Sequence, residues 1–167
     1  MTAQQTIQPL AACLLAGAIW LAATSVAHAR CDEIVLERFL ADRVFTLSAE
    51  SKIRLYDQRV FRYYGKRDQS RQQVFRAMRR WEERWPDRIY KFIRIRDYRE
   101  TEAGDACRVT FDYKFIAYDP ERDKTSAGIG RTSLVLAERN ARGDLRIVGE
   151  WGDVTCRGLD KFRRGRC

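Results

Sequence analysis

The chain has 167 residues, and its 32 lysines and arginines against 23 acidic residues give a formal net charge of +9 at pH 7. This length suits a single domain with its own core, and the charge would attract phosphate, anionic lipid or acidic glycan. A solvated arginine-rich surface explains the same composition. No C-x-x-C pair occurs and His28 is the only histidine, which argues against a metal site.

The N-terminal segment predicts an export signal that is removed. It has no charged side chain, an apolar run from Leu10 to Ala23, and the cleavage pattern Ala27-His28-Ala29 before Arg30. The run is shorter than the roughly 18 residues that cross a bilayer, so we expect no transmembrane segment in the mature chain. The predicted location is periplasmic or secreted. The predicted organisation is a cleaved signal peptide, one domain and a basic tail, at residues 1–29, 30–155 and 156–167.

The first part of the mature chain predicts two helices. Asp32 to about Leu47 has the spacing of a helix, and Ser48 can cap a short second helix. Asp57 to Tyr64 alternates loosely, which predicts a short strand or an extended arm. The apolar side of the first helix is expected to consist of Ile34, Val35, Phe39, Leu40 and Val44.

A longer helix is predicted from Ser70 to about Arg84. Ser70 and Gln73 have capping-box spacing, and Pro86 disfavours helical geometry in the residue before it. One broad apolar face recurs at steps of three and four, which predicts that its two tryptophans are buried. This face contains Val74, Phe75, Met78, Trp81 and Trp85.

After this helix the hydrophobic period changes from 3.6 to 2, and four strands are predicted at residues 88–100, 107–118, 128–139 and 145–154. The connectors between them are short and rich in turn residues, so the strands should form an antiparallel meander. Three helices and a meander can bury their apolar faces only against each other. The predicted fold class is therefore α+β, with about three N-terminal helices packed on a curved antiparallel sheet.

The chain contains the pattern Tyr63-Tyr64-Gly65, Ser70, Arg84-Trp85-Pro86-x-Arg88-x-Tyr90 and Ile147-Val148-x-Glu150. This pattern resembles the nuclear transport factor 2-like (cystatin-like α+β cone) superfamily, and within it a group of small secreted bacterial proteins. The resemblance implies a cone with a mouth between helices and sheet, where related enzymes such as isomerases, dehydratases and hydrolases place Asp, His, Tyr or Arg. An open sheet face also offers a surface for a homodimer.

We expect most of this pattern to be structural. Trp85 closes the core at the helix exit, Pro86 enforces the turn, and Arg88 pairs with a carbonyl or carboxylate at the helix end. The residues assigned this role are Ser70, Trp81, Arg84, Trp85, Pro86, Arg88 and Tyr90.

The residues that could act in the mouth form no recognisable catalytic motif, and the mature chain has no histidine for acid–base work. Glu150 is expected in a half-buried strand, where Arg131 on the adjacent strand could pair with it. A structural ion pair is the preferred interpretation, because an unpaired buried carboxylate is costly. No cofactor is implied. The pocket candidates are Asp57, Tyr63, Tyr64, Asp112, Arg131 and Glu150.

Four cysteines remain after cleavage, which in an exported protein predicts two disulfides. In the predicted meander Cys156 lies on the order of 30 Å from Cys107, too far for a bond. Two pairings remain: Cys31–Cys107 with Cys156–Cys167, or Cys31–Cys156 with Cys107–Cys167. We expect the first, because its short loop closes more easily.

Three functions are compatible with these features. We favour an exported, non-catalytic module that binds a small ligand or a protein partner. The alternatives are a cone-pocket enzyme acting on a small hydrophobic molecule and an electrostatic adaptor at anionic envelope surfaces. Arginines interleaved with aromatics between Tyr90 and Arg99 could mimic a nucleic-acid platform, but predicted export argues against nucleic acid.

Overall fold

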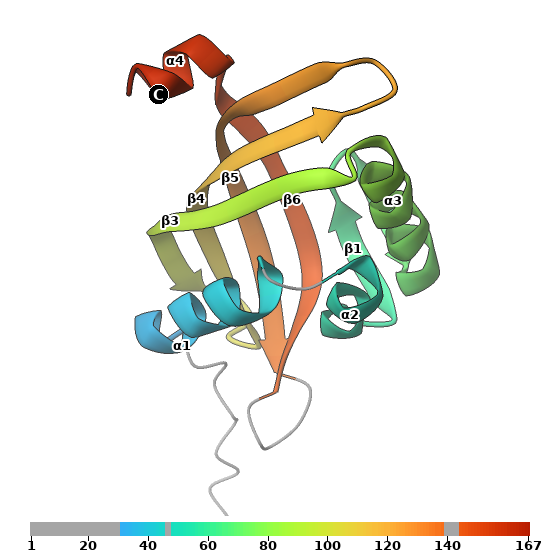
Figure 1. The fold of residues 1–167 in the computed structure, drawn as a ribbon. Helices are drawn as coiled ribbons and strands as arrows, with labels where there is room; N and C mark the ends of the chain where they lie inside the picture. The colour runs from blue at the N-terminus through green and yellow to red at the C-terminus, as the bar shows by residue number, and fades with distance from the viewer. Residues whose placement is uncertain (1–30, 46–47, 139–143) are drawn as a thin grey trace, which may run out of the picture.

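The computed structural model describes residues 31–45, 48–138 and 144–167; the predicted signal peptide lies outside these residues. Six strands form one curved sheet in the order β2-β1-β6-β5-β4-β3, and α1, α2 and α3 lie along its concave side (Figure 1). All neighbours are antiparallel except β1 and β6, which pair in parallel. The predicted α+β class is confirmed. The strands are β1 (Arg59–Tyr63), β2 (Lys66–Ser70), β3 (Asp87–Glu100), β4 (Ala106–Asp119), β5 (Lys124–Glu138) and β6 (Leu145–Arg157).

The helices begin where the sequence supplies caps. The Ser48 hydroxyl accepts a hydrogen bond from the Ser51 N–H, and Ser70 and Gln73 form the predicted capping box. None of the described helices is long and apolar enough to span a membrane. The helical elements are α1 (Glu33–Arg38), the π-helical segment η1 (Phe39–Val44), α2 (Ala49–Lys52), η2 (Ile53–Leu55), α3 (Arg71–Arg84) and α4 (Leu159–Arg163).

The buried side of the first helix differs from the prediction. Leu36 and Leu40 are completely buried, whereas Ile34 and Val35 are 61% and 43% exposed. Leu36, Leu40 and Val44 follow one another at four-residue steps, so they form a single line along the helix axis. Leu40 and Val44 were predicted on the buried side, but Leu36 was not, because the adjacent apolar residues at 34–36 fit more than one line.

The end of α3 also differs from the prediction. Val74 and Met78 are buried, but Trp81 is 48% exposed and Trp85 only partly buried. α3 packs on α2, η2, β1 and β2, but these contacts leave the Trp81 side chain half exposed. The Trp81 indole instead donates a hydrogen bond to the Tyr90 hydroxyl at 2.8 Å. The prediction that Trp81 is buried is therefore wrong.

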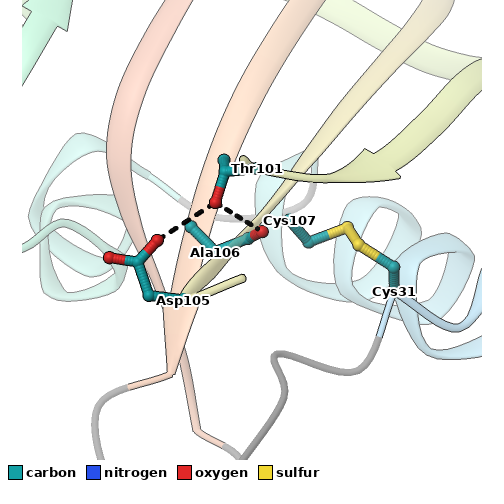
Figure 2. The surroundings of a disulfide bond; sticks show 5 residues. All are labelled: Cys31, Thr101, Asp105, Ala106 and Cys107. Carbon is teal, nitrogen blue, oxygen red and sulfur yellow. Dashed lines mark hydrogen bonds between the residues drawn. A yellow bond between two sulfur atoms is a disulfide. The ribbon is translucent and has the colours of Figure 1, made fainter. Parts of the chain in front are cut away.

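Both disulfides have the expected pairing. Cys31–Cys107 joins the residue before the α1 cap to β4, close to the β3–β4 turn that Thr101 and Asp105 hold together (Figure 2). Cys156–Cys167 joins the chain terminus to β6. The first bond fastens α1 to the sheet, and the second folds the basic tail back on the strand that precedes it.

The two disulfides should differ in their effect on stability. Cys31–Cys107 closes a loop with a sequence separation of 76 and fastens a core helix, whereas Cys156–Cys167 has a separation of 11 and confines only the tail. We expect the double substitution Cys31→Ser/Cys107→Ser to lower the free energy of unfolding in urea by about 4 kcal/mol. The matched control, Cys156→Ser/Cys167→Ser, should have a clearly smaller effect. An equal loss in both variants would contradict this assignment.

Candidate functional site

Glu150 on β6 places a buried carboxylate on the inner face of the sheet, among the core side chains. Glu150 is 5% exposed and lies opposite Leu134 on β5, which in turn lies opposite Val109 on β4. A carboxylate in such an apolar row needs hydrogen-bond donors. Two tyrosines supply them: the Tyr56 hydroxyl donates to Glu150 Oε2, and the Tyr64 hydroxyl donates to Oε1 at 3.0 Å.

The backbone between residues 56 and 64 brings these tyrosines to Glu150, because it runs alongside β6 (Figure 1). Tyr56 forms a parallel bridge with Ile147, and Tyr63 is the register partner of Glu150. The Tyr64 N–H then donates to the Glu150 carbonyl at 2.7 Å. Tyr64 has a φ of 51°, which is unusual for an aromatic residue. Its backbone and its hydroxyl are both held by Glu150.

Further aromatic rings extend from this point towards the end of α3. Tyr63 contacts Tyr56 and Tyr64 edge to face, with ring centroids 6.2 Å and 5.0 Å apart. Tyr113 on β4 lies against β5, where a Cβ at Gly130 would be 2.3 Å from its ring. The Tyr113 ring is also 6.0 Å from that of Tyr90 on β3. We call Glu150 and these five tyrosines the tyrosine cluster: Tyr56, Tyr63, Tyr64, Tyr90 and Tyr113.

The phenols of the cluster are held in their neutral form. Burial raises the pKa of Tyr56, Tyr63 and Tyr64, and the negative charge of Glu150 raises it further. Tyr64 leaves 40% of its surface exposed, so this effect concerns its hydroxyl, which faces Glu150. Burial also raises the pKa of Tyr113 to about 12. At neutral pH the cluster therefore contains hydrogen-bond donors, and none of its phenols can act as a base.

These shifts predict an alkaline signature. A tyrosine whose pKa is higher in the folded than in the unfolded chain stabilises the fold fully below its unfolded pKa of about 10, and that contribution is lost as the pH rises through the folded pKa. Tyrosinate absorbance should therefore develop at higher pH in the native protein than in concentrated urea. Stability should fall as the pH rises above about 10. Coincident titration curves in the two states would contradict the burial of these phenols.

The structure brings together three of the six pocket candidates, Tyr63, Tyr64 and Glu150. Asp57 lies beside them, at a small hollow between Arg71 and Arg146. Tyr56 and Tyr113 were not predicted. Tyr113 could have been found, because it alternates with the inward-facing Phe111 and Phe115, whereas Tyr56 falls between a helix and a strand, where no period applies.

The predicted pairing of Arg131 with Glu150 is wrong. Glu150 pairs in register with Leu134, three positions from Arg131, and an odd separation places two strand residues on opposite faces. Arg131 instead lies on the outer face, where its Nε donates to Asp112 Oδ1 at 2.8 Å. Arg96 also donates to Asp112, which is 3% exposed. Arg131 therefore forms an ion pair with Asp112 and not with Glu150.

Asp112 should make acid denaturation sensitive to substitution. Burial disfavours its charge, but hydrogen bonds from Arg131 and then Arg96 outweigh burial and lower the pKa of Asp112 below its usual value. A lowered pKa contributes stability above the unfolded pKa of about 3.9, and this contribution is lost as the pH falls through the folded pKa.

We therefore expect Asp112→Asn to lower the free energy of unfolding by about 1 to 2 kcal/mol at pH 7, since both arginine partners are partly exposed and screened by solvent. The difference in the free energy of unfolding between this variant and the unmodified protein should narrow at acidic pH. Urea titrations at several pH values measure both effects. A loss that is independent of pH would contradict an ionised Asp112.

Arg88 has the contacts expected of it at the end of α3. Arg88 donates to the Trp85 carbonyl at 3.0 Å and forms an ion pair with Glu82. Glu82 also accepts a hydrogen bond from the Ala49 N–H at 3.0 Å, so it links α3 to α2. The Trp85 indole nitrogen is buried without an acceptor among the described residues. Within the same part of the chain, no group of three His, Cys, Asp or Glu side chains could hold a metal ion.

A curved sheet with helices on its concave side and a polar cluster between them defines the class: the chain has the nuclear transport factor 2-like, or cystatin-like, cone fold. An NTF2-like superfamily protein from Salmonella enterica is similar, with a TM-score of 0.56 at 15% identity over 73% of this chain and 87% of that one. No protein-family profile and no curated protein sequence matches the chain.

Two further solved structures show the same fold. A protein with a cystatin-like fold from Caulobacter vibrioides has a TM-score of 0.57 at 14% identity, over 78% of this chain and 92% of that one. A putative scytalone dehydratase from Novosphingobium aromaticivorans has a TM-score of 0.58 at 12% identity, over 74% and 83%. The neighbours thus include a protein described only by its fold and one described as an enzyme.

Proposed function

We propose that the mature protein is an exported, non-catalytic module that binds a small, largely apolar molecule with a hydrogen-bond acceptor in the mouth of its cone. The observation that supports this proposal is that both carboxylate oxygens of Glu150 already accept hydrogen bonds from tyrosine hydroxyls. A general base needs a free oxygen within reach of the substrate proton. Glu150 instead orients the tyrosines around it.

The remaining groups in the cluster favour a ligand that accepts hydrogen bonds. The Tyr63 hydroxyl has no hydrogen-bond partner among the described residues, and the Tyr90 oxygen accepts from Trp81, which leaves its own proton available. Donors outnumber free acceptors, so a carbonyl or ether oxygen is the complementary group. The aromatic rings provide apolar contact for the rest of the molecule.

An enzyme acting on a small hydrophobic molecule is the alternative, since a putative dehydratase shares the fold. In such an enzyme the substrate would have to displace one tyrosine hydroxyl from the Glu150 carboxylate. We expect no turnover of simple steroid, epoxide or ester substrates. Activity that Glu150→Gln abolishes while the fold is retained would establish the enzyme alternative.

Two probes that differ only in a carbonyl test the binding proposal. Acetophenone should bind more tightly than ethylbenzene, and Tyr63→Phe should remove most of the difference. One hydrogen bond of about 1 kcal/mol corresponds to roughly fivefold in affinity. Protein-observed NMR titration measures both affinities. Tyr98→Phe, which changes an exposed tyrosine near Glu33, is the matched control and should leave the preference unchanged.

The binding proposal fails if the two probes bind equally, or if Tyr63→Phe and Tyr98→Phe have the same effect. Both variants should unfold at the same temperature as the unmodified protein, which ensures that the comparison concerns the site and not the fold.

A further inference from the structure

The outer face of the sheet is strongly basic, unlike the inner face. The strand register places alternate residues of β3 to β6 on this side, away from the core cluster. Its carboxylates are Asp87, Asp97, Asp112 and Asp153, and they are outnumbered by cations. The cations in these rows are Lys91, Arg94, Arg99, Arg108, Lys114 and Arg131. We call these six side chains, together with Arg62 and Arg96, the outer basic face.

Two arginines on this face are held in place without an acidic partner. The guanidinium carbons of Arg62 and Arg108 lie 4.8 Å and 5.2 Å from the centre of the Trp151 ring. Neither arginine forms an ion pair among the described residues, and Arg108 Nε is buried there without an acceptor. Arg62 Nε donates to the Tyr64 carbonyl at 3.4 Å, and stacking on the ring leaves the terminal N–H groups of the guanidinium for an anion. The indole thus orders two unneutralised charges.

A hollow of about 240 Å³ opens beside Trp151. Arg131, Ser133 and Thr155 line it together with Asp153, whose carboxylate opposes an anion inside the hollow. Arg131 is also already paired with Asp112, so we expect anionic groups over Arg62 and Arg108 beside the hollow and not within it.

The basic tail lies on the same side of the sheet. The Lys114 ammonium nitrogen is 5.9 Å from the centre of the Phe162 ring in α4. The Cys156–Cys167 bond returns the terminus to β6, and α4 lies at the end of the sheet near β5 (Figure 1). The tail therefore extends the outer basic face with Lys161, Arg163, Arg164 and Arg166.

Exposed apolar side chains accompany these charges. Ile89 and Ile116 are cross-strand partners on the outer side and are 69% and 37% exposed, and Phe61 beside Trp151 is 48% exposed. We propose that the outer basic face docks the protein onto a bilayer containing anionic phospholipid. Lipid phosphates complement the ordered arginines, and the interface provides an apolar environment for the isoleucines and Phe61.

Two other occupants fit these observations less well. A second copy of the chain would bring the same excess of arginines against itself, which like-charge repulsion opposes. A soluble acidic glycan would neutralise the charges but leave Ile89 and Ile116 in water. The Trp151 ring is also in contact with two guanidinium groups, which limits its use as a platform for sugars.

Cosedimentation with phosphatidylglycerol/phosphatidylcholine vesicles tests the proposal on the oxidised mature protein. We expect binding to these vesicles, little binding to pure phosphatidylcholine, and release at high salt. Arg62→Gln/Arg108→Gln should lower the partition coefficient by about tenfold or more. Arg76→Gln/Arg80→Gln is the matched control, because it removes the same charge from exposed α3 positions, and should change partitioning less than about threefold.

Several outcomes would overturn the proposal. These are no binding to the anionic vesicles, equal losses in the two double variants, dimerisation that depends on Arg62 and Arg108, or binding to soluble polygalacturonate in place of vesicles. If Arg62→Gln/Arg108→Gln does not fold, Arg94→Gln/Arg99→Gln removes two exposed charges from the same face and should also weaken binding. Tyr63→Phe should leave vesicle binding unchanged, so failure here is distinguishable from failure of the cone site.

Discussion

A carboxylate inside an apolar cone must be given hydrogen-bond donors, and much of the fold around β1 depends on that constraint. The donors to Glu150 come from Tyr56, after the second helical turn, and from Tyr64, at the β1–β2 turn. Because both donors are needed at one carboxylate, the chain between them must lie along β6. The one parallel strand pair of the sheet is the result. Removing the donors would leave a buried charge whose desolvation nothing offsets.

The period of two along the strands then separates two surfaces of different chemistry. The inner rows contain aromatic and aliphatic side chains with Glu150, and the outer rows contain arginines and lysines. Adjacent residues of one strand therefore serve different purposes: Asp112 neutralises Arg131 outside, while Tyr113 beside it joins the tyrosine cluster inside. A ligand in the cone and an anionic surface outside would contact the same sheet without sharing a side chain.

The disulfides hold one element on each of these surfaces. Cys31–Cys107 keeps α1 against the inner face, where Leu36 and Leu40 complete the core. Cys156–Cys167 keeps the tail beside the outer face, where its charges add to those of the strands. Each bond restricts the unfolded chain, but the longer loop restricts it more. The two bonds therefore have different consequences for stability even though their chemistry is the same.

The sequence alone determined the features that depend on neighbouring residues. Ser48 and Ser70 cap their helices, Pro86 ends α3, and the period of two marks β3 to β6, whose lengths exclude a Cys107–Cys156 bond. Only the tertiary structure decided the surroundings of Glu150, the partner of Arg131 and the exposure of Trp81. Each of these depends on the register between strands distant in sequence, or on where a neighbouring element ends. The hydrophobic period of one strand or helix indicates which residues share a face. It contains no information on strand register or on where neighbouring elements end, so it cannot predict what that face contacts.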